Sequence, residues 1–231
     1  MGCSPWPLRP LPAPELRLVL AVSLDGRLAP PSGGAAQIGG RGDRRVLEEA
    51  LAWADAALVG ANTLRLHGTT CLIREPDLLE QRRSQGRPAQ PIAVVVSRTG
   101  RFDSPLRFFS QPLTRWLLGP SLSEAPEGFE AVVPLHSWGE GIAALGARGL
   151  QRLVLLGGAE LAGALLQEQR VDELQLTLCP QLLGGPHSWL PPGVALEPNQ
   201  WQLLEQRLLE GEELLLRYGR LRDSAPGPRQ P

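Results

Sequence analysis

The sequence predicts an α/β domain with a central, mostly parallel sheet, helices on both faces and an antiparallel hairpin at the C-terminus. Short apolar runs typical of strands alternate with helical patterns along the whole chain. With 231 residues, 42% of them hydrophobic, the chain is long enough to bury a core without metal or disulfide support. We therefore expect one domain over residues 15–220, with disordered ends at 1–14 and 221–231.

The N-terminal half predicts two strand–helix units followed by a polar excursion. Apolar runs bounded by proline, glycine or aspartate are typical of buried strands, and apolar residues three to four positions apart are typical of helices. Asp43 is the expected cap of the first helix, because its carboxylate can accept free N–H groups. In chain order, the expected elements are a strand at Leu16–Ser23, a helix from Asp43 to Ala54, a strand at Ala56–Gly60, a helix at Asn62–Leu66 and a surface excursion at Glu75–Pro91.

The C-terminal half continues the alternation. Its valines and isoleucine make the run IAVVVS the most strand-prone of the chain, and the paired glycines at 157–158 separate a strand from a helix. The last segment alternates weakly around Gly211, which fits a hairpin or a helix, and we favour the hairpin. In chain order, the expected elements are strands at Ile92–Ser97, Trp116–Leu118 and Ala131–Val133, a helix at Gly141–Ala147, a strand at Leu153–Leu156, a helix at Glu160–Glu168, a strand at Leu174–Cys179 and the hairpin at 201–221.

Charge and residue usage exclude several classes of function. The 23 basic and 24 acidic residues give a net charge of -1, with no basic footprint for nucleic acid. No lysine occurs, which excludes a Schiff base, a pyridoxal phosphate anchor and the lysine of a P-loop. No apolar run reaches the ~18 residues of a membrane span, and the Pro-rich start lacks the apolar core of a signal peptide. We expect a soluble cytoplasmic protein that acts on a small molecule, without nucleic-acid or membrane partners.

Three expected strand ends carry glycine or small polar residues, at the edge where parallel sheets bind ligands. They are Gly60–Thr63, Ser97–Gly100 and Gly157–Glu160. Glycine lets the backbone approach a pyrophosphate, and N–H groups at a helix start bind its oxygens. A tight turn would explain a lone glycine pair, but two such sites together with Arg98 favour a dinucleotide. Ser97 and Arg98 could bind the 2′-phosphate of NADP. The G-x-G-x-x-G fingerprint is absent, so this site differs from that of a Rossmann fold.

Four segments occur in the order and spacing found in the riboflavin-biosynthesis pyrimidine reductases. They are AVSLDGRLA (21–29), ADAALVGANTLR (54–65), VLLGGAELAGALL (154–166) and VDELQLTLCPQLLGG (171–185). Over Leu16–Tyr218 the chain resembles the reductase domain of that family, which has the dihydrofolate-reductase fold. The resemblance implies NADPH-dependent reduction of 5-amino-6-(5-phosphoribosylamino)uracil to its ribitylamino product. Hydride transfer to C1′ of the open, imine-like sugar needs no protein nucleophile. The resemblance also implies a homodimer, for which Trp189 is a candidate anchor.

The family pattern implies roles for individual residues. The cofactor would lie along Gly60, Ala61, Asn62 and Thr63, with Ser97 and Arg98 at its 2′-phosphate and Gly157, Gly158 and Ala159 at its nicotinamide and pyrophosphate. Ser23 and Asp25 would face the reaction site. Asp25 is the candidate for orienting the substrate or relaying a proton, unless Asp25-Gly26 only forms a turn. The residues that would bind the substrate phosphate, or else form surface ion pairs, are Arg44, Arg65, His67 and Arg74.

The chain departs from the family pattern on the substrate side. Leu66–Thr70 stands where members carry Asp-Asp-Pro, and Leu156 stands where a glutamate precedes the paired glycines. Two alternatives therefore stay open. One is a dihydrofolate or other pterin reductase, whose carboxylate on the first helix would be Glu48 or Glu49. The other is a degenerate domain that binds a nucleotide or a partner without turnover.

Neither a metal site nor a zinc-dependent deaminase activity is expected. The three histidines, His67, His136 and His187, have no metal-ligand spacing, so we expect no metal site. The H-x-E and P-C-x-x-C signatures of a zinc deaminase are also absent, so we expect no deamination by this chain.

Overall fold

The computed structural model describes residues 13–35, 37–102, 106–122 and 124–221. The disorder expected at 1–14 and 221–231 therefore falls on residues that lie outside the described ranges, apart from 13, 14 and 221. Pro14 is buried, and its ring lies against Gly146. The folded domain thus includes Pro14.

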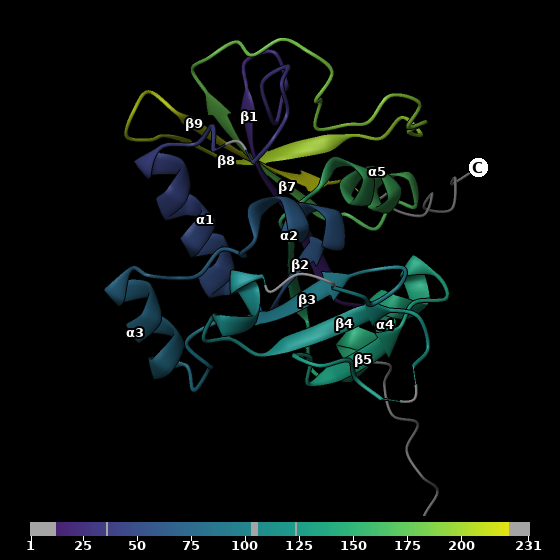
Figure 1. Ribbon diagram of the computed structural model, residues 1–231. Coiled ribbons are helices and arrows are strands. Elements are labelled where there is room, and N and C mark those ends of the chain that lie inside the picture. The colour runs from purple at the N-terminus through teal and green to yellow at the C-terminus, as the bar shows by residue number, and fades with distance from the viewer. Residues whose placement is uncertain (1–12, 36, 103–105, 123, 222–231) are drawn as a thin grey trace, which may run out of the picture.

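Within these residues, one nine-stranded sheet forms the centre of the molecule (Figure 1). Its strands are β1 (Glu15–Ser23), β2 (Ala56–Gly60), β3 (Ile92–Val96), β4 (Arg115–Gly119), β5 (Ala131–Pro134), β6 (Arg152–Leu155), β7 (Glu173–Cys179), β8 (Trp201–Leu208) and β9 (Leu214–Arg220). Their order across the sheet is β5-β4-β3-β2-β6-β1-β7-β9-β8. All pairs from β5 to β7 are parallel, whereas β9 is antiparallel to both β7 and β8. The predicted parallel sheet and C-terminal hairpin are confirmed.

Helices cover both faces of the sheet, as predicted. They are α1 (Arg41–Trp53), α2 (Ala61–His67), α3 (Pro76–Ser84), α4 (Trp138–Ala147), α5 (Ala159–Gln167) and a 3-10 turn at Arg107–Ser110. Successive side chains of a strand point to opposite faces. Accordingly, Leu18 and Leu20 of β1 belong to the core under α4 and α5, whereas Val19 belongs to the core under α1 and α3 (Figure 1).

The predicted cap of α1 is wrong. The helix begins at Arg41, its N-cap is Gly40, and Asp43 lies inside the first turn. The capping group is the carboxylate of Glu213, from the turn between β8 and β9, which accepts the N–H groups of Gly40 and Asp43. The Asp43 N–H lies 2.7 Å from this carboxylate, across 170 positions of sequence. A cap from so far away leaves no local sequence signal, and it frees the side chain of Asp43.

The segment Glu75–Pro91 is more than the expected surface excursion, because it contains α3. Pro76 starts this helix at a position where its missing N–H costs nothing. Arg82 in its last turn is only 1% exposed. Its guanidinium donates to carbonyls at and beyond the end of α1 and after α3, namely those of Leu51, Ala52, Ala54 and Pro88. Arg82 therefore joins the two helices through backbone groups.

Candidate functional site

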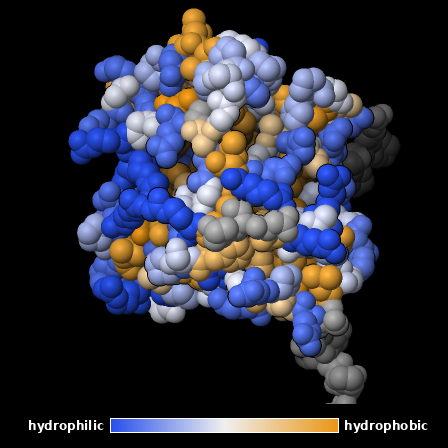
Figure 2. Space-filling model, in the orientation of Figure 1, coloured by the Kyte–Doolittle hydropathy of each residue, from blue (hydrophilic) through white to orange (hydrophobic). Residues whose placement is uncertain are grey.

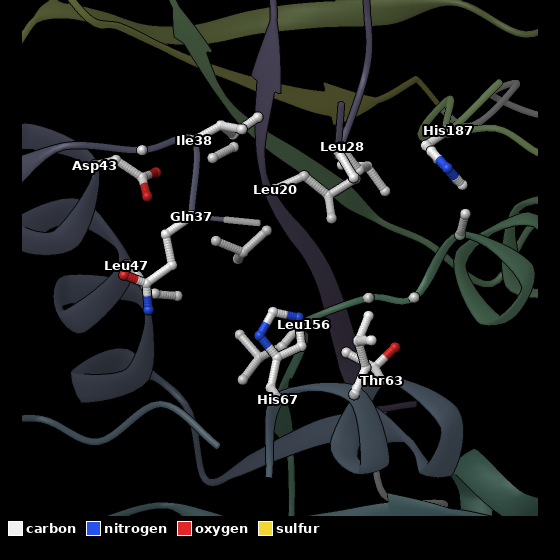
Figure 3. A pocket seen from close by; sticks show the side chains of 18 of the residues that line it. Leu20, Leu28, Gln37, Ile38, Asp43, Leu47, Thr63, His67, Leu156 and His187 are labelled. Atoms are coloured by element: carbon white, nitrogen blue, oxygen red, sulfur yellow. The ribbon is translucent and has the colours of Figure 1, made fainter. Parts of the chain in front are cut away.

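A cavity of about 640 Å³ opens beside β1 and the carboxyl end of β6. Its walls come from β1, the 28–40 loop, α1, α2, the segment after β6 and residues 187–188 (Figure 3). In the space-filling view, apolar residues lie recessed between polar ones on the same side of the molecule (Figure 2). Ligands of open parallel sheets bind in this position, outside the carboxyl ends of the strands.

The walls are largely apolar and carry a few polar groups. Leu20 lies near the middle of the view, between Thr63 and His67 on one side and Asp43 on the other, and Leu156 lies beside His67 (Figure 3). The other polar side chains of the described lining are Gln37, Arg44, Cys71, His187 and Ser188. Volume and lining are those of a small-molecule site.

Two of the three predicted strand ends meet at this cavity. The N–H of Gly60 donates to the carbonyl of Gly157 over 3.3 Å, across the ends of β2 and β6. A Cβ built on Gly158 would lie 2.6 Å from Oγ1 of Thr63. Thr63 and Gly157–Ala159 line the cavity, whereas Gly60, Ala61 and Asn62 do not belong to the lining. Gly158 is the N-cap of α5 and offers no capping side chain, so exposed backbone faces the cavity where this helix begins.

The third strand end lies outside the cavity lining. Ser97 is buried, and its Oγ accepts the N–H of Gly100 over 3.0 Å, which shapes the turn after β3. Arg98 is exposed on this turn. Arg65 of α2 donates to the carbonyl of Arg101 over 2.9 Å and so lies at the same turn. The prediction that Arg65 binds the substrate phosphate is therefore not supported by its position, because the side chain points away from the cavity toward the β3 loop.

The other predicted phosphate ligands gather near Cys71. Arg44 and His67 line the cavity, as does Cys71, whereas Arg74 is exposed outside the lining. Burial raises the pKa of the Cys71 thiol, and the charges of Arg44 and Arg74 act on it in the opposite direction. Arg44 is held in place, because its Nε donates to Glu48 over 2.6 Å. The charges of Asp43 and Glu48 raise the pKa of the thiol, so both signs of charge lie near this end of the cavity.

Ser23 and Asp25 anchor a turn and do not belong to the cavity lining. The hydroxyl of Ser23 donates to Asp25 over 2.6 Å, and the N–H groups of Leu183 and Gly184 donate to the same carboxylate over 3.1 and 2.8 Å. The hydrogen bond from Ser23 is the largest cause that lowers the pKa of Asp25, to about 2. The two backbone hydrogen bonds act in the same direction. A carboxylate that is ionised at neutral pH has no proton to give, so the geometry gives no support to the predicted proton relay.

The Asp25→Asn variant is expected to lose stability at neutral pH and to show a weaker dependence of stability on pH in acid. Because folding lowers the pKa of Asp25 from 3.8 to about 2, its ionised form stabilises the native state above pH ~4. That contribution disappears as the pH falls through about 2. Thermal unfolding midpoints between pH 2 and 6 test this: the curves of wild type and variant should converge toward low pH. Parallel curves would show that Asp25 does not couple folding to protonation.

Asp43 is a cavity residue that the sequence analysis missed as a site residue. It lines the cavity with Leu47, one helical turn later on the same face of α1, and its carboxylate points inward (Figure 3). It interacts with the side chain of Thr177. Burial raises the pKa of Asp43, and the charge of Glu213 acts in the same direction. The four-residue spacing of Asp43 and Leu47 could have placed both on one helix face. The capping role expected for Asp43 directed attention away from that face.

The prediction that Glu48 or Glu49 would face a pterin is wrong. Glu48 is only 1% exposed and accepts the N–H groups of Arg74 and Glu75 over 2.6 and 2.9 Å, in addition to the guanidinium of Arg44. Glu49 forms ion pairs with Arg45 and Arg207. Neither residue belongs to the cavity lining, because both lie on other faces of α1.

Among the described residues, no group of three or more His, Cys, Asp or Glu is arranged to hold a metal ion. No helix in the described part of the chain is long and apolar enough to cross a membrane. Trp189 is half-buried and lies against Gly26, so it is not the exposed anchor that was expected. The homodimer stays a prediction.

Comparisons with known proteins agree with the resemblance seen in the sequence. Residues 14–210 match the model of the RibD C-terminal domain. The chain is 26% identical over 182 residues to the 2,5-diamino-6-ribosylamino-4(3H)-pyrimidinone 5′-phosphate reductase of Archaeoglobus fulgidus, covering 74% of this chain and 83% of that one. It is 30% identical over 182 residues to the riboflavin biosynthesis protein RibD of Escherichia coli, covering 74% of this chain and 50% of the relative. The chain thus spans half of that longer protein.

Solved structures support the fold. A pyrimidine reductase-like protein from Corynebacterium diphtheriae superposes with a TM-score of 0.73 at 24% identity, covering 91% of this chain and 93% of that one. The dihydrofolate reductase of Enterococcus faecalis, in complex with NADP(H), gives a TM-score of 0.50 at 15% identity, covering 90% and 97%. The predicted dihydrofolate-reductase-like fold is confirmed. Because the family model matches nearly the whole of the described domain, this chain belongs to the RibD C-terminal domain family.

Proposed function

We propose that this chain is an NADPH-dependent reductase of riboflavin biosynthesis, which reduces the ribosyl carbon of a 5-amino-6-(5-phosphoribosylamino)pyrimidine. The observation that carries the proposal is the meeting of Thr63 with Gly157–Gly158 at the wall of the cavity, in a chain of this family. The substrate is either the uracil implied by the sequence resemblance or the 2,5-diamino pyrimidinone named in the Archaeoglobus relative.

The residues at this wall fit a dinucleotide. Any side chain at 158 would meet Thr63, so glycine keeps backbone exposed at the N-terminus of α5. N–H groups at a helix N-terminus attract a pyrophosphate. Thr63, Gly157, Gly158 and Ala159 would hold the nicotinamide and pyrophosphate, and Arg98 with Arg65 would bind the 2′-phosphate at the β3 turn. When bound there, NADPH supplies the hydride for the reduction.

The chain would position the substrate in the part of the cavity beside this wall. Arg44 and His67 would bind its phosphate at the end near Cys71. The apolar side chains of Leu20 and Leu156 would contact the pyrimidine and keep water away from the reacting carbon. Such positioning in a dry site lowers the barrier of hydride transfer without a covalent intermediate.

The function is tested by following NADPH oxidation at 340 nm with each phosphoribosylaminopyrimidine in turn. We expect turnover with NADPH and one of the two pyrimidines, and none with dihydrofolate. Isolation of the ribitylamino product identifies the bond that is reduced. Absence of turnover on both pyrimidines, with NADPH still bound, would exclude this reaction and favour a degenerate domain.

Preference for NADPH over NADH is expected to depend on Arg98. The Arg98→Ala variant should bind NADPH about tenfold more weakly, since one charge-assisted bond to the 2′-phosphate is lost. Its affinity for NADH should stay unchanged. The control is Arg148→Ala, which removes another exposed arginine, one that donates to the carbonyl of Ala144 at the end of α4. Equal losses for the two cofactors would rule out 2′-phosphate recognition by Arg98.

A second candidate function is the reduction of a dihydropterin, and the position of Asp43 favours it. This carboxylate faces the cavity from the first helix, which is where the sequence analysis expected a pterin-binding acid. Tight competition by methotrexate in an assay with dihydrofolate would support this candidate. An unaffected pyrimidine turnover in the presence of methotrexate would exclude it.

A further inference from the structure

Among the described residues that line the cavity, Asp43 is the single acidic side chain. We propose that Asp43 is a specificity-determining residue, which reads position 2 of the pyrimidine and selects the 2-amino form over the uracil. This inference rests on the proposed reductase function and names the substrate more closely. It leaves the assignment of the cofactor residues as it stands.

The carboxylate of Asp43 is held in a defined position. Its own N–H is bound by Glu213, which fixes the first turn of α1, and Thr177 of β7 interacts with its side chain. Gly39 lies directly against it, since a Cβ built there would overlap with Oδ2 of Asp43. The carboxylate therefore enters the cavity from one fixed side, across from Thr63 (Figure 3).

Among the described residues, no guanidinium forms an ion pair with this carboxylate, and Arg44 acts on it only through its charge. Arg44, the next residue along α1, donates to Glu48 over 2.6 Å and to the carbonyl of Leu72 over 2.8 Å. On the other side, Glu213 is itself a carboxylate that accepts two N–H groups. Asp43 therefore has acceptor capacity that a ligand with N–H donors can use, in a wall that is otherwise mostly apolar.

The two pyrimidines present opposite groups to such a wall. The 2-amino form carries an amino group beside a ring N–H, and this pair of donors matches the two oxygens of a carboxylate. The uracil carries a carbonyl oxygen at position 2, and two acceptors that face one another in a partly buried site repel and leave lone pairs unsatisfied. A site built to bind an N–H group rejects an analogue that lacks it.

A preference for the 2-amino pyrimidine would fix the order of two reactions, the reduction of the sugar and the deamination at position 2. If the reductase accepts the 2-amino pyrimidine, then reduction precedes the exchange of the amino group for oxygen. The product must next be consumed by a hydrolytic deamination, in which water adds at C2 and ammonia leaves. The exchange changes neither the oxidation state of C2 nor the carbon skeleton, so it requires no second reductant.

The experiment compares kcat/KM for the two pyrimidines in wild type, Asp43→Asn and Glu49→Gln, the last being the matched carboxylate-to-amide change on another face of α1. We expect wild type and Glu49→Gln to prefer the 2-amino form by at least about tenfold, which is one charge-assisted hydrogen bond. In Asp43→Asn the preference should collapse or invert, because the amide can donate to the uracil carbonyl and accept from the ring N–H. Equal preference in wild type, or a preference that Asp43→Asn leaves unchanged, overturns the inference.

A binding measurement separates this inference from the proposed function. Calorimetry on the NADP-loaded protein compares 2,5,6-triamino-4-pyrimidinone with 5,6-diaminouracil, which lack the sugar and need no turnover. Selective binding of the triamine that Asp43→Asn abolishes would support the role of Asp43 even if neither phosphoribosyl substrate were reduced. Turnover of both substrates at equal rates, with equal binding of both bases, would support the reductase function and overturn the inference about Asp43.

Discussion

The Arg82→Met variant is expected to lower the free energy of unfolding by about 3–5 kcal/mol, which is typical of breaking a buried charged network. Arg82 is 1% exposed, and burial lowers its pKa to about 10, so it stays charged at neutral pH. Its guanidinium donates to the carbonyls of Leu51 and Pro88, which methionine would leave without this donor. It also donates to the carbonyls of Ala52 and Ala54, which Arg87 shares. Each buried acceptor left unpaired costs about 1–3 kcal/mol. Urea denaturation followed by tryptophan fluorescence measures the loss.

The neighbouring Arg83 provides the matched control. Arg83 is exposed, and its one side-chain contact in the described structure is with Glu80 on the same helix. The Arg83→Met change should therefore alter the free energy of unfolding by no more than about 0.5 kcal/mol, as is usual for exposed ion pairs. Similar losses for the two variants would show that the carbonyl contacts of Arg82 do not stabilise the fold.

The Gly158→Ala variant is expected to bind NADPH at least about tenfold more weakly than wild type, a loss of about 1.4 kcal/mol or more. The new Cβ would lie 2.6 Å from Oγ1 of Thr63, which is closer than any van der Waals contact. Thr63 must then move, and both residues line the wall proposed to hold the cofactor. Titration of NADPH fluorescence measures the affinity, and a thermal midpoint near that of wild type shows that the fold is retained.

Two companion variants isolate the cause of this loss. Combining Gly158→Ala with Thr63→Ala removes the clashing oxygen, so the double variant should bind NADPH more tightly than Gly158→Ala alone. Gly139→Ala adds a methyl group in the first turn of α4, where it meets only the flexible tip of Arg170. Its NADPH affinity should equal that of wild type. A Gly158→Ala variant with unchanged affinity would exclude this wall as the cofactor site.

The strands and the glycine-lined wall of the cavity were predictable because their signals are local. Apolar runs ending in glycine predicted β2 and β6 within one residue of their observed ends, and parallel pairing brings such ends to one edge of a sheet. The neighbourhood of Gly60, Thr63 and Gly158 follows from that geometry. The order of the four family segments predicted the fold for the same reason, since each segment carries its own strand or turn.

The residues that the sequence misassigned are those whose surroundings come from distant parts of the chain. Glu213 reaches across 170 positions to cap α1, and this contact releases Asp43 into the cavity. Arg82 reads as a surface arginine until α3 packs on the end of α1. Arg65 and Asp25 carry the charges expected of site residues, yet backbone groups of other loops hold them elsewhere. The sequence by itself thus determined the sheet, the helices beside it and the glycine-lined wall, because backbone conformation and side-chain periodicity are local properties. Only the tertiary structure decided which charged side chains face the cavity, because a charge takes its role from partners that folding brings together.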